Sequence, residues 1–123
     1  MRSLKALVVD DAALARVVLK RILAENGFEE IFEAENGEKA IQLYKEQRPN
    51  LVTMDITMPE MDGITCIRKL MEIDSNANII VCSALGQKEV VIEAIQAGAK
   101  HFMIKPFDND KIVKIVKAVM SLV

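Results

Sequence analysis

The fold class of this chain is decided by residues 51–63, LVTMDITMPEMDG. The segment opens on a short apolar run at 51–54, which favours a strand buried in a sheet. Asp55 stands at the end of that run. Apolar residues then recur at helical spacing, at Ile64, Ile67 and Met71. The segment and its continuation therefore indicate a buried strand, an acidic residue at its end, and an amphipathic helix.

The same alternation of a short apolar run and a helical stretch extends along the whole chain. The apolar runs lie at residues 4–9, 31–34, 51–54, 78–83 and 101–104. Stretches of about 10 to 15 residues with helical periodicity separate them, and another follows the last run. Five strands that alternate with five helices predict an α/β fold, in which helices joined by right-handed crossovers cover both faces of a parallel sheet.

Turn and capping residues set the expected ends of the helices. The second helix begins after Asn36 and ends before Pro49, because a residue that precedes proline is pushed out of the helical region. Gly98 is expected to close the fourth helix in a left-handed conformation, and Asp108 or Asn109 can cap the start of the last helix. The apolar face of the first helix is expected to carry Leu14, Val17, Val18 and Ile22.

Composition restricts the class of protein. A length of 123 residues is that of one domain, so residues 1–123 are expected to form a single domain with no further output domain. A net charge of −2 and an aromatic content of 4% argue against nucleic-acid binding and against base or flavin stacking. No apolar run is long enough to span a membrane, and Cys66 and Cys82 fit no metal-binding spacing. We therefore expect a cytoplasmic protein.

The strand ends carry the candidate functional residues, because ligands of doubly wound sheets bind at the carboxyl ends of the strands. Asp10 and Asp11 follow the first run, Asp55 the third, Ser83 the fourth and Lys105 the fifth. Each residue alone has a commoner structural role. An aspartate or serine there often caps a helix, which is as good an explanation for Asp11 as ligand binding, and a lone lysine is usually solvated. Taken together, the five residues indicate a site.

Three carboxylates at neighbouring strand ends would repel one another by about 3 kcal/mol for each pair at ~5 Å and an effective dielectric constant near 20. A Mg²⁺ ion, which prefers oxygen ligands, would relieve this repulsion. A cation and a lysine beside a reactive carboxylate also suit phosphoryl transfer. With a reference pKa of about 3.9, Asp55 is ionised at pH 7 and can act as a nucleophile without a general base. Ser83 and Lys105 could then contact the oxygens of the resulting acyl phosphate.

Four segments carry a resemblance to a known family. They are Asp10-Asp11, LVTMDITMPEMDG around Asp55, IIVCSALGQ around Ser83, and HFMIKPF around Lys105. From residue 4 to the final helix the chain resembles the receiver domain of two-component response regulators, and its central segments are most similar to single-domain chemotaxis regulators. The resemblance implies a doubly wound, flavodoxin-like sheet of five parallel strands in the order 2-1-3-4-5, with five helices.

The resemblance also implies the roles of the site residues. Asp55 would be the phosphoacceptor for a histidine kinase, and Lys105 would bond the phosphoryl group through its ammonium, with a cis peptide bond to Pro106. Ser83 and Phe102 would form the switch that reports phosphorylation. The ligands of Mg²⁺ would be Asp10, Asp11, Asp55 and the backbone carbonyl of Thr57.

Two residues depart from the pattern of similar regulators. Phe102 stands where many of them carry tyrosine, so it could report only by burial, since it has no hydroxyl; an aromatic residue in a central strand is equally explained as core. Leu85 stands where a polar side chain could orient the water that attacks the phosphoryl group. Because leucine forms no hydrogen bond, we expect comparatively slow self-dephosphorylation.

Two enzyme or carrier functions fit the sequence less well. Phosphatases with an aspartate nucleophile carry a second aspartate two residues later, where this chain has Thr57. A flavodoxin-like FMN carrier needs a hydroxyl-rich phosphate loop after the first strand, where Asp10 and Asp11 would repel phosphate. The chain is therefore expected to act by binding rather than as an enzyme, although labelling by small phosphodonors and self-dephosphorylation are expected.

The expected partners follow from the resemblance. They are a chemotaxis-type sensor histidine kinase, a flagellar motor switch protein or another phospho-dependent target, and a phosphatase. Neither nucleic acid nor membrane is expected as a partner, and the chain is expected to be a monomer. In the family the fourth helix, fifth strand and fifth helix form the output face, which here carries Lys88, Lys100, His101 and Lys105 and suits an acidic segment. Two alternatives stay open, namely a phosphorelay intermediate and a receiver domain cut from a larger transcriptional regulator.

Overall fold

The computed structural model describes residues 3–58, 60–84 and 87–120. Its strands are β1 (Leu4–Val9), β2 (Phe28–Ala34), β3 (Leu51–Asp55), β4 (Ile79–Ala84) and β5 (His101–Lys105). Its helices are α1 (Ala13–Glu25), α2 (Gly37–Gln47), α3 (Gly63–Ile73), α4 (Lys88–Ala97) and α5 (Asn109–Met120). Among the described residues no helix is both long enough and apolar enough to cross a membrane.

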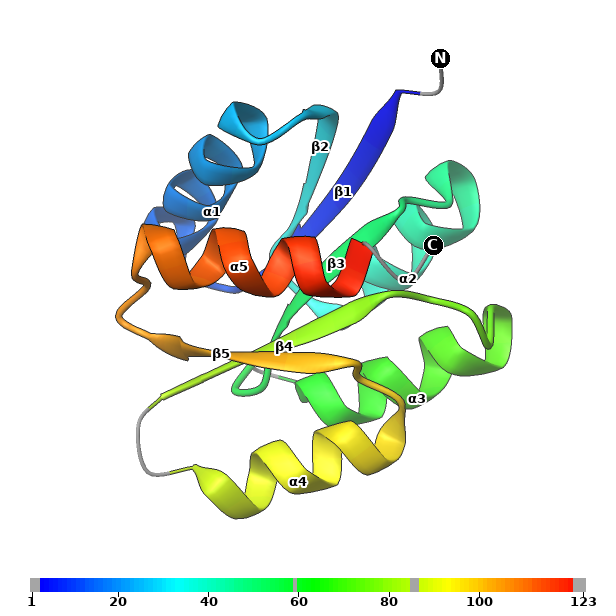
Figure 1. The fold of residues 1–123 in the computed structure, drawn as a ribbon. Coiled ribbons are helices and arrows are strands. Elements are labelled where there is room, and N and C mark those ends of the chain that lie inside the picture. The colour runs from blue at the N-terminus through cyan, green and yellow to red at the C-terminus, as the bar shows by residue number, and fades with distance from the viewer. Residues whose placement is uncertain (1–2, 59, 85–86, 121–123) are drawn as a thin grey trace.

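The strands form one parallel sheet in the order β2-β1-β3-β4-β5. This order confirms the predicted doubly wound, flavodoxin-like α/β fold. Figure 1 shows α1 and α5 on one face of the sheet and α2, α3 and α4 on the other. From β1 the chain adds β2 on one side, and from β3 onward it adds strands on the other side, so the switch point lies between β1 and β3. A doubly wound sheet places its ligand site beside such a switch point.

Each strand sends alternate side chains to the two faces, so the sheet separates two apolar cores. The core under α2, α3 and α4 includes Leu7, Val52, Met54, Ile79, Val81, Ile67 and Leu70. The core under α1 and α5 includes Val8, Leu51, Ile80, Cys82, Met103, Leu19, Leu23 and Ile112. The central strands β1, β3 and β4 are buried almost throughout, as expected for strands covered on both faces.

The predicted apolar face of α1 was largely wrong. The helix buries Leu19, Ile22 and Leu23. The other three expected core residues are exposed, with exposed fractions of 76% for Leu14, 50% for Val17 and 36% for Val18. The reason is that the inward position one turn before Leu19 is taken by Arg16, whose guanidinium bonds polar groups at the end of the sheet. The first turns of α1 therefore present their apolar residues to solvent.

Most expected helix ends are confirmed. The side chain of Asn36 caps α2, which ends at Gln47 before Pro49. Gly98 ends α4 with a φ of 132°, and the Asp108 carboxylate accepts hydrogen bonds from the first amides of α5. The suggested capping of α1 by Asp11 was wrong, because the N-cap is Ala12 and no side chain caps that helix.

Three strands, β2, β3 and β5, are longer than the apolar runs that predicted them, and β4 is shifted by one residue. β2 begins at Phe28 rather than at residue 31. It is an edge strand, and its exposed Glu29 and Glu30 interrupt the apolar pattern. β4 continues through Ser83 to Ala84, so Ser83 lies within the strand rather than after it.

Candidate functional site

The acidic residues meet at the carboxyl ends of β1 and β3. The strand register pairs Val9 with Met54, so the residues that follow, Asp10 and Asp55, are neighbours at the edge of the sheet. One carboxylate oxygen from each of Asp10, Asp11 and Asp55 lies within 4.8 Å of the others. Asp10 and Asp55 are 1% and 6% exposed, whereas Asp11 is open to solvent. The cluster is therefore anchored in the sheet and accessible from one side.

This donor set fits a magnesium ion. All three side chains offer carboxylate oxygens, and no sulfur or imidazole ligand belongs to the cluster among the described residues. Mg²⁺ prefers such hard oxygen ligands and keeps several waters, so an accessible group of a few carboxylates suits it. The chemistry of the residues is compatible with the ion that the sequence predicted.

Lys105 supplies the positive charge within the site. Its Nζ lies 2.8 Å from Oδ2 of Asp10 and 3.4 Å from Oδ1 of Asp55. Because β4 separates β5 from β3, the side chain reaches across a whole strand to make these contacts. Partial burial by itself lowers the pKa of Lys105, but the two carboxylates raise it above its ordinary value. The lysine therefore stays charged while it bridges the two buried aspartates.

The electrostatic environment of Asp55 differs from that of a free carboxylate. Burial and then the charge of Asp10 raise the pKa of Asp55 to about 6, although Lys105 acts in the opposite direction. Asp55 is mainly ionised at pH 7, as expected. It nevertheless binds a proton more tightly than a free aspartate does, whose reference pKa is about 3.9. The raised pKa means that Lys105 compensates only part of the cost of placing this carboxylate beside Asp10.

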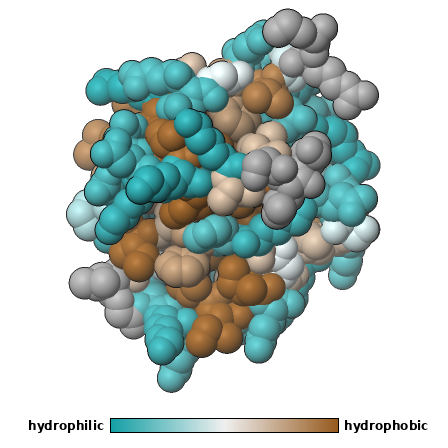
Figure 2. All heavy atoms as spheres, viewed as in Figure 1, coloured by the Kyte–Doolittle hydropathy of each residue, from teal (hydrophilic) through white to brown (hydrophobic). Residues whose placement is uncertain are grey.

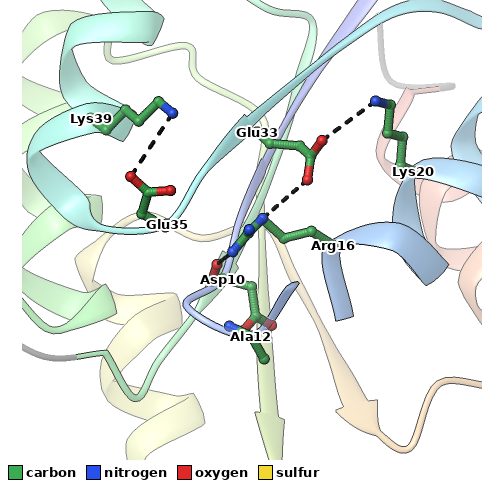
Figure 3. A network of polar contacts seen from close by, with 7 residues as sticks. All are labelled: Asp10, Ala12, Arg16, Lys20, Glu33, Glu35 and Lys39. Atoms are coloured by element: carbon green, nitrogen blue, oxygen red, sulfur yellow. Dashed lines mark hydrogen bonds and ion pairs between the residues drawn. The ribbon is translucent and has the colours of Figure 1, made fainter. Parts of the chain in front are cut away.

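Asp10 is held through every polar group that it has. Its amide donates to the carbonyl of Ala34 at 3.1 Å, and its Oδ1 accepts from the amide of Ala12 at 2.9 Å. Its carbonyl accepts from Nη1 of Arg16 at 2.7 Å, and the same guanidinium donates from Nε to Glu33 at 3.0 Å (Figure 3). Arg16 was not predicted as a functional residue. Its signal in the sequence is its spacing, because it stands three residues before Leu19 and seven before Leu23, which α1 buries.

Gly63 was also missed, and it sets the distance between α3 and the site. A Cβ atom at this position would lie 2.2 Å from the carbonyl oxygen of Asp55 and 2.8 Å from Cα of Ile56. The Gly63 amide donates to the carbonyl of Ile56 at 2.9 Å. Helix α3 thus begins in direct contact with the backbone that carries Asp55, and a larger residue would push the two apart.

The side chains of the predicted switch residues point to the face of the sheet that carries α4. Cys82 is the register partner of Asp55, so the next residue, Ser83, points to the opposite face. Ser83 is buried, and it lines a cavity of about 420 Å³ together with Phe102 and residues of α4. Phe102 is 39% exposed, which excludes the alternative that it is a core residue. The structure thus brings Ser83 and Phe102 together at one cavity, with Ser83 one residue beyond the strand position that pairs with Asp55.

The remaining predicted residues have simpler outcomes. Thr57 lies in the loop after β3 and is exposed; the role of its carbonyl stays a prediction. The peptide bond between Lys105 and Pro106 is cis, as the resemblance implied. Leu85, on which the expected slow dephosphorylation depends, lies outside the described residues.

A sheet of this order, with acids at the ends of β1 and β3 and a lysine at the end of β5, defines the receiver domain of response regulators. Residues 6–117 match the response regulator receiver domain family, and the chain belongs to that family. Within it, the chain is similar to the chemotaxis protein CheY of Bacillus subtilis, at 54% identity over 117 residues, which cover 95% of this chain and 98% of that protein.

Two further comparisons agree. The chemotaxis protein CheY of Thermotoga maritima is 54% identical over 115 residues, covering 94% of this chain and 96% of that protein. The crystal structure of the CheX-CheY-BeF3-Mg²⁺ complex from Borrelia burgdorferi contains a chain with a TM-score of 0.89 and 42% identity, over 94% of this chain and 88% of that one. The chain is therefore a CheY-type receiver domain, which is a signalling domain.

Proposed function

We propose that this chain is a phosphorylation-dependent switch of a two-component system in the cytoplasm. Asp55 accepts a phosphoryl group from a chemotaxis-type histidine kinase, and the phosphorylated chain binds the flagellar motor switch. The observation that carries the proposal is the cluster at the sheet edge, in which three carboxylates lie within 4.8 Å of one another and Lys105 contacts two of them. That cluster combines a nucleophile, oxygen ligands and a fixed cation.

The transfer needs no general base. A carboxylate oxygen of Asp55 attacks the phosphorus of a phosphohistidine, a P–O bond forms, and the P–N bond to the imidazole breaks. The electron pair of the broken bond stays on the ring nitrogen of the leaving imidazole. No proton has to leave Asp55, because its carboxylate is already ionised. A pKa of about 6 keeps Asp55 mainly ionised at pH 7. Lys105 is placed to turn its ammonium group from the carboxylates to the oxygens of the phosphoryl group.

A Mg²⁺ ion would be held by Asp10, Asp11, Asp55 and the carbonyl of Thr57. When bound, it supplies positive charge to carboxylates that repel one another and to the phosphoryl oxygens. Support comes from the oxygen-only donor set and from the raised pKa of Asp55. The relative from Borrelia burgdorferi is a complex with BeF3 and Mg²⁺, which favours the same pairing of an ion and a phosphoryl-like group here.

The proposed signal passes from Asp55 through Ser83 to Phe102. Phosphorylation would draw the Ser83 hydroxyl toward the new oxygens. Because Ser83 and Phe102 line one cavity of about 420 Å³, that movement would leave room for the Phe102 ring to turn inward. Phe102 has no polar tip, so its burial alone would report the phosphorylated state.

The proposed output face is formed by α4, β5 and α5. Figure 2 shows apolar side chains gathered over β5 and α4. The exposed apolar residues of this face are Ile92, Ile95, Phe102 and Ile104. Exposed lysines flank them at positions 88, 100 and 111. An apolar strip with a basic rim suits an acidic, amphipathic partner segment, which the motor switch or a phosphatase would supply to the monomeric chain.

Labelling with a small acyl phosphate and Mg²⁺ tests the phosphoacceptor. We expect stable labelling of the wild type, loss of labelling in Asp55→Asn, and unchanged labelling in the matched control Asp108→Asn, which makes the same chemical change in an exposed capping residue. Removal of Mg²⁺ with a chelator should also suppress labelling. Full labelling of Asp55→Asn would refute the site.

The labelled protein also separates the proposed output from a relay. We expect it to bind a motor-switch peptide more tightly than the unlabelled protein does. Transfer of the label to a histidine phosphotransfer domain, without tighter peptide binding, would instead identify a phosphorelay intermediate.

A further inference from the structure

Arg16 connects the metal-binding loop to the edge of the sheet. Its guanidinium donates to the carbonyl of Asp10 at 2.7 Å and to Oε1 of Glu33 at 3.0 Å. The side chain is 15% exposed, whereas Lys20, which contacts the other oxygen of Glu33 at 3.4 Å, is half exposed. Figure 3 shows Arg16 between the two elements, with Glu33 on β2 and Asp10 at the end of β1.

The contact fixes one particular peptide group. The carbonyl of Asp10 and the amide of Asp11 belong to the same peptide plane, and the amide of Asp10 is already bonded to Ala34 on β2. With Arg16 in place, the peptide groups on both sides of Asp10 are held. The orientation of the second peptide sets the directions in which the Asp10 and Asp11 side chains leave the backbone.

We propose that Arg16 is a positioning residue for the magnesium site: by holding the Asp10–Asp11 peptide against Glu33, it aligns the two carboxylates and raises their affinity for Mg²⁺ without touching the ion. The inference rests on the proposed function, because it assumes that the acidic cluster binds Mg²⁺. Outer groups that orient metal ligands typically change metal affinity by about 10- to 100-fold.

Charge alone predicts the opposite effect. Arg16 is a cation close to a cation site, so its removal should strengthen Mg²⁺ binding if it acted only through its charge. A positioning role predicts weaker binding instead. Arg16→Lys separates the two explanations further, because it keeps the positive charge but loses the planar fork that bonds Asp10 and Glu33 together.

Isothermal titration of the unphosphorylated protein with Mg²⁺ tests the inference. For Arg16→Gln and Arg16→Lys we expect the Kd for Mg²⁺ to rise about tenfold. The matched control Lys20→Gln removes a cation that bonds the same Glu33 and does not contact Asp10, so its Kd should stay within about twofold of the wild type. In the metal-free protein the amide resonances of Asp11 and Ala12 should shift in the Arg16 variants only. At saturating Mg²⁺, labelling by acyl phosphate should return to the wild-type rate.

The outcomes distinguish the inference from the function on which it rests. Unchanged or tighter Mg²⁺ binding in both Arg16 variants would overturn the positioning role and leave the proposed function intact. Absence of Mg²⁺ binding in the wild type would overturn both. Urea unfolding of each variant identifies any protein that does not fold, and the conservative Arg16→Lys variant then decides the result.

Discussion

Asp55 lies at the carboxyl end of the sheet and Asp74 lies before β4, near the amino end, and their pKa values move in opposite directions. Burial and the charge of Asp10 raise the pKa of Asp55 to about 6. Hydrogen bonds from the amide of Asn76 and the hydroxyl of Tyr44 lower the pKa of Asp74. The carboxylate of Asp55 is buried beside another negative charge, whereas the carboxylate of Asp74 accepts hydrogen bonds from two donors.

The surroundings of Asp74 are built from complementary groups. The hydroxyl of the buried Tyr44 donates to it at 2.8 Å, and the amide of Asn76 donates at 2.9 Å. Arg48 lies 3.9 Å from the same carboxylate and 5.8 Å from the centre of the Tyr44 ring. Nearby, the side chain of Asn78 donates to the carbonyl of Asn50. This end of the sheet satisfies its polar groups and contributes to stability.

The two ends of the sheet therefore have different roles. The functional end concentrates negative charge that a bound cation or a phosphoryl group can use, and this concentration costs folding free energy while the site is empty of both. The amino end carries no such conflict. Removing the carboxylate charge of Asp55 and removing that of Asp74 should therefore have opposite signs in stability measurements.

Gly63→Ala, at the functional end of the sheet, should change stability most. The added methyl would meet backbone atoms of residues 55 and 56 that cannot move alone, so we expect a loss of about 3 kcal/mol in the free energy of unfolding. The matched control is Gly37→Ala, whose added methyl would have side-chain atoms of Met61 as its three nearest neighbours and should cost less than about 1 kcal/mol, because that side chain can move. Urea unfolding measures both. Equal costs would show that the close approach of α3 to Asp55 is unimportant.

The next effect is a gain in stability from Asp55→Asn. Raising a carboxyl pKa from 3.8 to about 6 on folding penalises the folded state at pH 7, and removing the charge should stabilise the metal-free protein by up to about 3 kcal/mol. Asp74→Asn should have the opposite sign. A loss of stability in Asp55→Asn, measured by urea unfolding without Mg²⁺, would contradict the electrostatic conflict described for this end.

The pH dependence of stability provides the control for that prediction. Because the folded state binds the Asp55 proton more tightly than the unfolded state, this group makes the protein more stable as the pH falls from 7 to 5, by about 1 kcal/mol. The rise should be missing in Asp55→Asn. The lowered pKa of Asp74 acts at lower pH, where its contribution is lost as the carboxylate becomes protonated.

The smallest effect is expected from Tyr44→Phe at the amino end. The change removes one hydrogen bond to the partly exposed Asp74 and leaves the buried ring in place. We expect a loss of roughly 0.5–1 kcal/mol in the free energy of unfolding and a rise in the pKa of Asp74 toward its ordinary value. Titration of the Asp74 carboxyl by NMR checks the second expectation, and an unmoved pKa would assign its lowering to the Asn76 amide and to the nearby cations Arg48 and Lys100.

The fold was predictable because its signals are local and repeated. Five apolar runs separated by helical stretches specify a parallel α/β sheet, and strand ends of such a sheet share one edge. The clustering of Asp10, Asp55 and Lys105 followed from that topology and from the resemblance to receiver domains. No contact between distant residues had to be known in advance.

The missed features depend on tertiary contacts. Leu14 and Arg16 both lie on the first helix, and periodicity alone does not reveal that the cation rather than the leucine faces the sheet. The need for glycine at position 63 arises from its approach to a backbone carbonyl eight residues earlier in the chain. The raised pKa of Asp55 arises only when burial and Asp10 act on it together.

The reach of Lys105 across β4 has a consequence for the order in which the molecule is assembled. Its contact with Asp10 joins residues 95 positions apart in sequence, so it closes a loop that contains most of the chain. Closing a loop of this length costs conformational entropy, and the contact can form only once β5 has joined the sheet. Until β5 docks, Asp10 and Asp55 lack their lysine, and a partly folded chain carries an acidic edge without its own counter-ion. The addition of β5 therefore completes both the sheet and the site, because it brings Lys105 to Asp10 and Asp55.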